Sequence, residues 1–173
     1  MPDGMTSQIL LTADSIITAG DRAFVAPELI SAVDAVLNQQ YGVTDWKADK
    51  DVIERLARAY DAIRGSFSPE RYTGDVPYMW AAYYVAQNTY NAQAVLSHAL
   101  QCMREIPREF YIIDLGAGVG PTTWAVADYI RVVAHLCSIY GIEQPYDRVT
   151  VRSFEWSQDR KEIFKQIRAT YLQ

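Results

Sequence analysis

The residues best placed to do chemistry are glycines that follow one short apolar segment. The motif Asp114-Leu115-Gly116-Ala117-Gly118-Val119-Gly120 comes directly after Phe110-Tyr111-Ile112-Ile113, a β-branched and aromatic run typical of a strand. Glycine lets a ligand approach the main chain, and a following helix offers unpaired N–H groups and the positive end of its dipole. The pattern predicts a ligand-binding turn at the carboxyl end of a strand, where open α/β folds bind ligands. A tight turn without a ligand, in which Asp114 caps the helix, is the alternative.

The spacing of the glycines separates this motif from two others. The dinucleotide fingerprint is G-x-G-x-x-G, whereas the third glycine here comes one residue earlier. A phosphate loop carries Lys and then Ser or Thr after its glycines, and Pro121-Thr122 stands there instead. The spacing therefore disfavours an NAD-dependent enzyme, which is kept as a third alternative.

The segments around the motif predict one βαβ unit and its continuation. Expected are a strand over 110–115, a helix over 122–140, a polar loop over 143–148, a strand over 149–154 and a last helix that Ser157 caps. This order implies a parallel pair of strands with a right-handed crossover. The charged side chains of the last helix, Arg160 among them, are expected on a solvated face. The predicted fold class is α/β, a partial Rossmann-like βαβα unit preceded by a helical N-terminal region.

The first hundred residues show mainly helical spacing of their apolar residues. Helices are expected over 27–42, 49–63 and 78–103, with an exposed loop over 66–77 and a helix stop at Gly65. Residues 1–25 are ambiguous between short strands and the face of a helix. The chain is accordingly divided into a helical region, 1–77, and the portion with the glycine motif, 78–173.

The segment Ile113–Gly120 resembles the first motif of class I S-adenosylmethionine (SAM)-dependent methyltransferases. The resemblance covers about residues 78–173 and implies a Rossmann-like methyltransferase fold with SAM as cofactor. It implies that Gly116, Ala117 and Gly118 pass beside the aminoacyl and sugar part of SAM. Asp114 would bond toward the methionine amino group.

The same family has an acidic residue at the end of its second strand that holds both ribose hydroxyls. Glu155 occupies that place after 149–154, and Trp156 beside it is a further expected cofactor contact. A carboxylate suits a vicinal diol because it accepts two hydrogen bonds. The long helix and the loop before the second strand account for the wide separation of Glu155 from the glycines.

A narrower resemblance is to the ribosomal small-subunit methyltransferase-like family linked to mitochondrial ribosome assembly. Tyr84, Asn88 and Tyr90, with Trp124-Ala125 after the motif, look like its pattern. The resemblance implies RNA as the methyl acceptor and a lid over substrate or cofactor formed by Tyr84, Asn88 and Tyr90; packing is the alternative for the tyrosines. Gln87 stands near the place of that family's arginine, and its cysteine-rich metal site has no counterpart here, so no metal is expected.

A complete enzyme of this class resembles a seven-stranded sheet with catalytic residues after the fourth strand. This sequence shows only two such strands, so no catalytic residue is assigned. Three explanations stay open: a fragment of a longer enzyme, a reduced protein completed by a partner chain or a second copy, or strands donated by the region from Ile9 to Val25. The leading expectation is a SAM-binding domain of a methyltransferase; the competing one is a noncatalytic degenerate fold acting as a partner or scaffold.

The composition limits which binding partners and which cellular location can be expected. The 173 residues carry a net charge of −5 with a pI of about 5.0, which argues against nonspecific coating of nucleic acid or anionic lipid. Cys102 and Cys137 are too few for a disulfide framework, and Cys137 is expected as a buried, small apolar residue. Without an apolar leader or a membrane-length run, the expected location is cytoplasmic, with no membrane contact.

Overall fold

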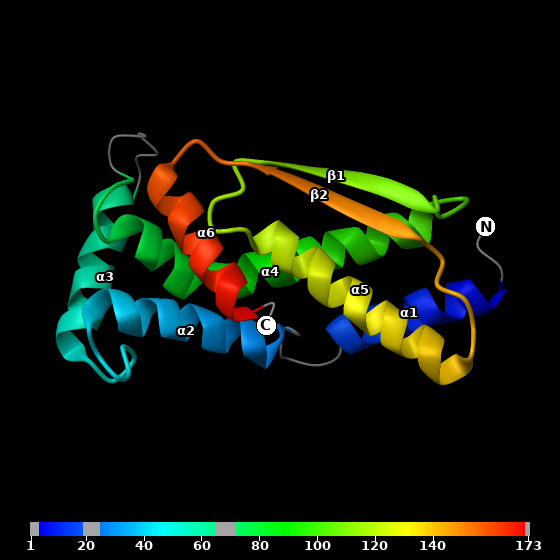
Figure 1. Ribbon diagram of the computed structural model, residues 1–173, viewed down its shortest axis with the longest axis horizontal. Helices are drawn as coiled ribbons and strands as arrows, with labels where there is room; N and C mark the ends of the chain where they lie inside the picture. Colours follow the sequence, from blue (N-terminus) through cyan, green and yellow to red (C-terminus); the bar gives the residue numbers. More distant parts are fainter. Residues whose placement is uncertain (1–3, 19–24, 65–71, 172–173) are drawn as a thin grey trace. The chain divides into compact units, whose positions relative to one another are not determined.

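The computed structural model describes residues 4–18, 25–64 and 72–171 (Figure 1). In chain order its elements are α1 (Gly4–Thr18), α2 (Pro27–Tyr41), α3 (Lys50–Ile63), α4 (Val76–Cys102), β1 (Glu109–Leu115), α5 (Pro121–Tyr140), β2 (Arg148–Phe154) and α6 (Gln158–Tyr171). Helices thus combine with a two-stranded parallel sheet, which confirms the α/β class. None of the described helices is long and apolar enough to cross a membrane.

The chain forms two compact units, defined by their internal contacts. The sheet unit comprises Met1–Val25, Gln87–Ala117 and Pro121–Phe154, and the helical unit comprises Ala26–Ala86, Gly118–Gly120 and Glu155–Gln173. Helix α4 contributes to both. The domain boundary expected between residues 77 and 78 stays a prediction.

In the sheet unit, β1 and β2 pair in parallel, as predicted, with a register from Glu109 opposite Arg148 to Leu115 opposite Phe154. Arg108 donates to the carboxylate of Asp147, which holds together the starts of the two strands. Side chains alternate along β1, so that every second one turns toward the helices of this unit. The buried core beneath the sheet comprises Ile9, Leu10, Ala13, Leu100, Tyr129, Val133, Leu136, Cys137 and Tyr146.

The N-terminal segment is a helix, so the proposal that it donates strands is wrong for residues 4–18. Ile9, Leu10 and Ala13 are buried in the core of the sheet unit, where α1 contacts α5. Residues one, three and four apart share one helix face, whereas a strand would send Ile9 and Leu10 to opposite sides. The apolar runs were too short for their period to be read from the sequence. Residues 19–24 lie outside the described part.

The helical unit confirms the helices expected over 27–42 and 49–63. Pro27 occupies the first turn of α2, and Gly42 ends it with a left-handed φ of 67°. Helix α2 packs against α6, and Leu29, Leu37 and Ile167 are fully buried. Gly65, the expected stop of α3, lies outside the described residues, and Arg64 is the C-cap.

The loop expected over 66–77 is too long at its C-terminal end. Helix α4 begins at Val76, where the Val76 N–H donates to the Thr73 carbonyl and the Met79 N–H donates to that of Asp75. Pro77, which the sequence places in the loop, fits a first helical turn because its missing N–H would have no intrahelical partner there. Residues 65–71 of the expected loop lie outside the described part.

Candidate functional site

The glycine motif forms the turn between β1 and α5. Gly116, Gly118 and Gly120 have φ values of 73°, 58° and 90°, all in the left-handed region that favours glycine. A Cβ added to Gly116 or Gly118 would meet no atom within 4 Å. Backbone conformation rather than crowding therefore requires these two glycines, and the space beside them can admit another molecule.

Within the sheet unit, the motif is fastened to the end of β2. The N–H groups of Gly116 and Ala117 both donate to the Phe154 carbonyl, at 2.9 and 3.0 Å. Both bonds end on the last residue of β2, directly after the final register pair, Leu115 opposite Phe154. The first two amides of the loop are thereby used inside the protein and are not available to a ligand.

Asp114 lies near the carboxyl end of β1, as predicted, and is half-buried. Its neighbour across the sheet is Ser153, and the Ser153 hydroxyl lies 2.9 Å from that of Thr123 in the first turn of α5. The strand end and the helix start thus bring a carboxylate and two hydroxyls into one region of the sheet unit. Such groups suit a ligand that carries an ammonium group and hydroxyls.

Within the helical unit, Glu155 follows β2 directly, as predicted. Its Oε2 accepts the Gly118 N–H at 2.7 Å and its Oε1 accepts the Ser157 N–H at 2.8 Å. The side chain is only 5% exposed. The carboxylate therefore bonds to the third amide of the glycine loop and to the start of α6.

Arg160 also belongs to this cluster, so the expectation of a solvated face is wrong for this residue. Its side chain is 12% exposed, and its Nη1 lies 3.4 Å from Glu155 Oε2. The guanidinium lies 4.3 Å from the ring centroid of Tyr72 and 5.9 Å from that of Trp80. A buried carboxylate needs a charged partner, and an arginine one helical turn after the Ser157 cap was the available signal.

These contacts determine which hydrogen-bond donors and acceptors of the cluster remain available to a ligand. The amides of Gly116, Ala117 and Gly118 all donate to acceptors of the protein. Glu155 uses three interactions, whereas a carboxylate has about four lone-pair sites. Within the helical unit, a diol would therefore share this carboxylate with Gly118 or displace it.

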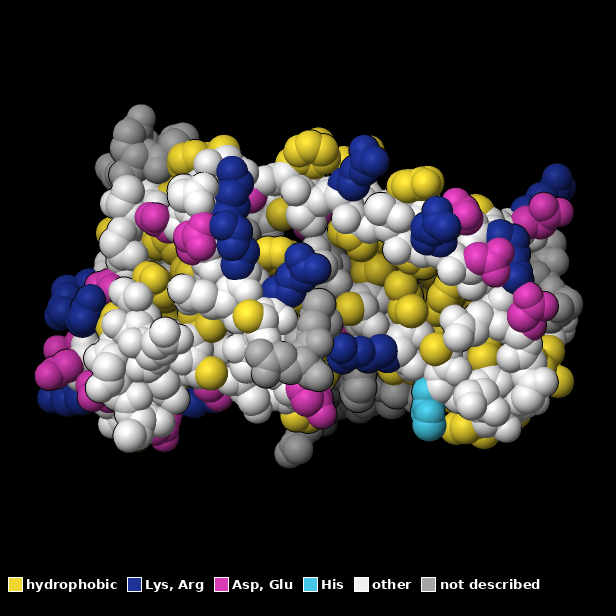
Figure 2. Space-filling view, in the orientation of Figure 1, with side chains coloured by type: hydrophobic (Ala, Val, Ile, Leu, Met, Phe, Trp, Pro, Cys, Tyr) yellow, Lys and Arg dark blue, Asp and Glu magenta, His cyan; other side chains and the backbone are white. Residues whose placement is uncertain are grey.

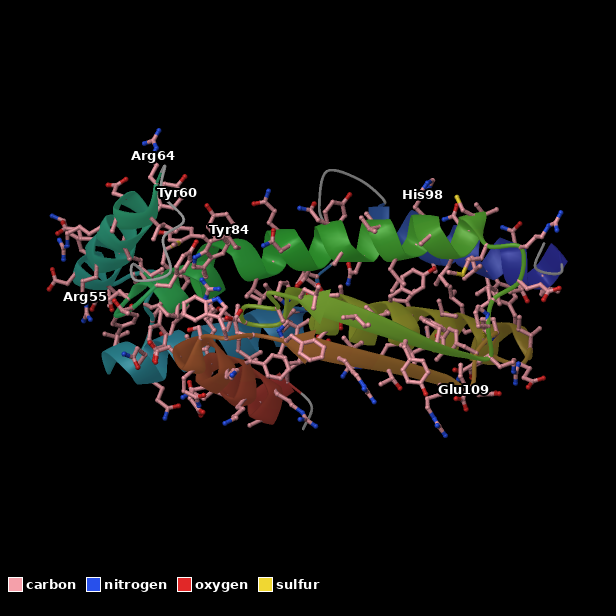
Figure 3. The ribbon with its side chains drawn as sticks, turned by 90° about the horizontal axis from the view of Figure 1, so that it is seen from above. Arg55, Tyr60, Arg64, Tyr84, His98 and Glu109 are labelled. Atoms are coloured by element: carbon pink, nitrogen blue, oxygen red, sulfur yellow. The ribbon has the colours of Figure 1, made fainter. Side chains whose placement is uncertain are left out.

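The remaining expected contacts do not all lie together. Trp156 is largely exposed in the helical unit. Tyr84 lies against Trp80, with ring centroids 4.3 Å apart, and burial followed by its interaction with Tyr60 raises the pKa of Tyr84 (Figure 3). Tyr90 packs against the core of the sheet unit, which is the packing alternative, and Asn88 is half-buried.

A hollow of about 450 Å³ in the helical unit was not expected from the sequence. Its floor and walls include Arg55, Arg58 and Asp75. Arg55 donates through Nε and Nη2 to the Asp75 carboxylate, at 3.1 and 2.9 Å, and the Tyr41 hydroxyl donates to the same group at 3.0 Å. Asp75 neutralises Arg55, whereas Arg58 has no acidic partner in the lining, so the hollow carries a net positive charge. Arg55 and Arg58 lie on the helix expected over 49–63, and Asp75 lies in the loop expected over 66–77.

The two cysteines differ in exposure: Cys102 is exposed, with its Sγ 3.7 Å from His98 Nε2, whereas Cys137 is buried. Cys137 is buried, as predicted, and burial raises the pKa of its thiol. Within the part of the chain that the structure describes, no three His, Cys, Asp or Glu side chains gather as metal ligands would. Comparison of the chain with family models, curated proteins and solved structures gives no match. Any assignment of function therefore depends on the geometry of the glycine motif and Glu155.

Proposed function

We propose that this chain binds SAM at the glycine motif and is the SAM-binding part of a Rossmann-like class I methyltransferase. The observation that carries the proposal is the hydrogen bond from the Gly118 N–H to Glu155. It brings the acid after the second parallel strand to the left-handed glycine turn after the first. Open space beside the glycine Cα atoms supports the proposal further.

Each group in the cluster has a role toward the cofactor. Asp114 accepts a hydrogen bond from the methionine amino group, and the bare backbone of Gly116 and Ala117 lies along the aminoacyl part. Glu155 accepts from the ribose diol, which shares the carboxylate with the Gly118 N–H or displaces it, and exposed Trp156 offers a flat apolar surface. SAM supplies an electrophilic methyl group, and transfer needs chiefly its alignment with a nucleophile. The described residues supply the donor site, and RNA is the first acceptor to test.

One observation favours a second candidate, a noncatalytic scaffold. The Glu155 carboxylate and the three loop amides already have partners inside the chain. A motif whose polar groups already have partners can have a purely structural role, which is to hold the loop against α6. The two candidates differ in whether a ligand enters the space beside Gly116 and Gly118.

Isothermal titration calorimetry with SAM and with its demethylated product separates them. We expect micromolar binding that Gly118→Arg abolishes, because the new side chain fills the space beside the loop. Gly141→Arg is the matched control, since Gly141 has a φ of 65° and equally open surroundings at the end of α5. If neither ligand gives heat of binding, the result contradicts SAM binding and supports the scaffold. Binding of NAD instead of SAM would contradict both candidates.

A labelled methyl group then tests for transfer. Incubation of the wild-type chain with labelled SAM and separate pools of RNA, protein and small molecules should label one pool, and Gly118→Arg should label none. If SAM binds and no pool is labelled, the chain is a binding domain without activity of its own.

A further inference from the structure

We infer that the outer face of the sheet binds a second copy of this chain. Tyr111, Ile113 and Leu115 of β1 are 60%, 66% and 78% exposed, and Phe154 of β2 is 56% exposed. Their alternation places all four on the face opposite the one that α5 of the same unit covers (Figure 1). Figure 2 shows hydrophobic side chains along the margin at which Figure 1 draws the two strands.

A bare apolar face of this kind is unusual for a parallel sheet. Parallel sheets are covered on both faces in almost all proteins, and contiguous exposed apolar patches mark interaction sites. At about 200 Å² for a large side chain, the four residues expose roughly 500 Å². Two copies joined through this face would bury roughly 1,000 Å², near the lower limit for a specific interface. We therefore expect a weak dimer whose population depends on concentration.

The charges at the rim of this face are complementary to themselves. Glu109, labelled in Figure 3, stands opposite Arg148 where the strands begin. Both side chains are exposed, with 3.7 Å between their charged atoms. A two-fold axis along the strands places β1 of one copy over β2 of the other. Each Glu109 then meets an Arg148 of the partner at one end, and each Leu115 meets a Phe154 at the other. This self-complementarity favours a second copy over an unrelated protein.

Arg152 fits the same arrangement. It faces outward beside Ile113, its Cα partner on β1, and has no hydrogen bond or ion pair among the residues that the structure describes. Its methylene stem can cover the apolar side chains while the guanidinium stays at the rim. The inference does not rest on the proposed function, because Leu115 is the one motif residue that takes part and it has no role toward the proposed cofactor.

Sedimentation velocity of the full chain over a wide range of concentrations tests the dimer. We expect the average mass to rise from that of the 19.6 kDa chain toward twice that value. Ile113→Lys should weaken association at least about tenfold, because it brings a charge into the centre of an apolar interface. Ile139→Lys is the matched control, since Ile139 is also largely exposed but lies near the end of α5. Circular dichroism confirms that both variants fold.

A charge exchange tests the partner's identity. Glu109→Arg alone and Arg148→Glu alone should each be monomeric, because each repels its own copy at the rim. Their mixture should form a heterodimer, because one chain then carries two positive and the other two negative rim charges. A wild-type chain that stays monomeric, a dimer that Ile113→Lys leaves intact, or a mixture without heterodimer would each overturn the inference.

Discussion

At the scale of single residues, Glu155 organises the junction between the glycine loop and α6. It accepts N–H groups from Gly118 and Ser157 and pairs with Arg160, and almost none of its side chain is exposed. Buried polar groups cost free energy when a partner is removed. Glu155 is therefore expected to contribute to the stability of the helical unit whether or not a ligand binds.

Replacing Glu155 by Gln should lower the free energy of unfolding by about 1–3 kcal/mol, because Arg160 loses its counter-charge and the amide nitrogen opposes an N–H donor. Urea denaturation followed by circular dichroism measures the change. Glu162→Gln is the control: Glu162 pairs with Lys165 on the exposed side of α6, so the loss should stay within about 0.5 kcal/mol. Equal losses for both variants would contradict the structural role of Glu155.

Gly118→Ala separates backbone strain from ligand contact. Gly118 and Gly42 both have a left-handed φ and open surroundings, so an alanine at either should cost about 1 kcal/mol of stability. Urea denaturation should show the same loss for Gly118→Ala and Gly42→Ala. Titration with SAM should show weaker binding for Gly118→Ala alone. Unchanged affinity in that variant would place the ligand away from the loop.

At the scale of elements, capping fixes where the helices of the helical unit begin. The Asp49 carboxylate accepts the N–H groups of Asp51 and Val52 at 3.0 and 3.1 Å at the start of α3. The Ser157 hydroxyl, predicted as the cap of α6, accepts the Arg160 N–H at 3.4 Å. Because Asp49 accepts two shorter hydrogen bonds, we expect its cap to contribute more to the free energy of unfolding than that of Ser157.

Asp49→Ala should lower the free energy of unfolding by about 1–2 kcal/mol and Ser157→Ala by about 0.5 kcal/mol. Both values come from urea denaturation of single variants. Asp61→Ala is the control because Asp61 lies on an exposed position of the last turn of α3, where its side chain caps nothing. A loss at Ser157 larger than that at Asp49 would contradict the order of the two caps.

The sequence predicted those elements whose own residues decide their conformation. Helices α2 and α3 carry long apolar faces and clear stops, and the two strands carry β-branched runs that end at glycines or at Glu155. The sequence did not predict conformation or burial where contacts between residues far apart in the chain determine them. The short apolar runs of α1 become one helix only because the core of the sheet unit receives Ile9 and Leu10. Arg160 is buried only because Tyr72, Trp80 and Glu155 surround it.

At the scale of the whole molecule, the pairing of two strands was predictable, whereas what covers them was not. Pattern alone placed Asp114 and Glu155 at the ends of parallel strands, since the order of strand and helix dictates that pairing. The outward exposure of Tyr111 and Ile113 could not be predicted, because a continuous apolar run normally means burial on both faces. An additional layer, supplied by a second copy, reconciles the run with its exposure.

Tyr146, which is buried in the sheet unit, and Tyr41, which is half-buried in the helical unit, each make the stability of their unit sensitive to alkali. Burial, more than any nearby charge, raises the pKa of Tyr146 in the sheet unit and that of Tyr41 in the helical unit above their ordinary value near 10. The unfolded chain therefore releases these protons at a lower pH than the folded one. Stability should be full below about pH 10 and should fall above it by up to about 1.4 kcal/mol per pH unit for each tyrosine.

Tyr146→Phe should remove the contribution of Tyr146 to this loss, at the cost of the hydrogen bond to the Ile130 carbonyl at 3.3 Å. Urea denaturation from about pH 9 to pH 11 measures the slope, which should decrease by about 1.4 kcal/mol per pH unit relative to the wild type. In Tyr140→Phe the slope should stay that of the wild type, because the Tyr140 phenol is exposed to water in the folded chain as well. A Tyr146→Phe variant with the wild-type slope would show that this phenol ionises without leaving the core, and the burial of Tyr146 beneath the sheet would then be wrong.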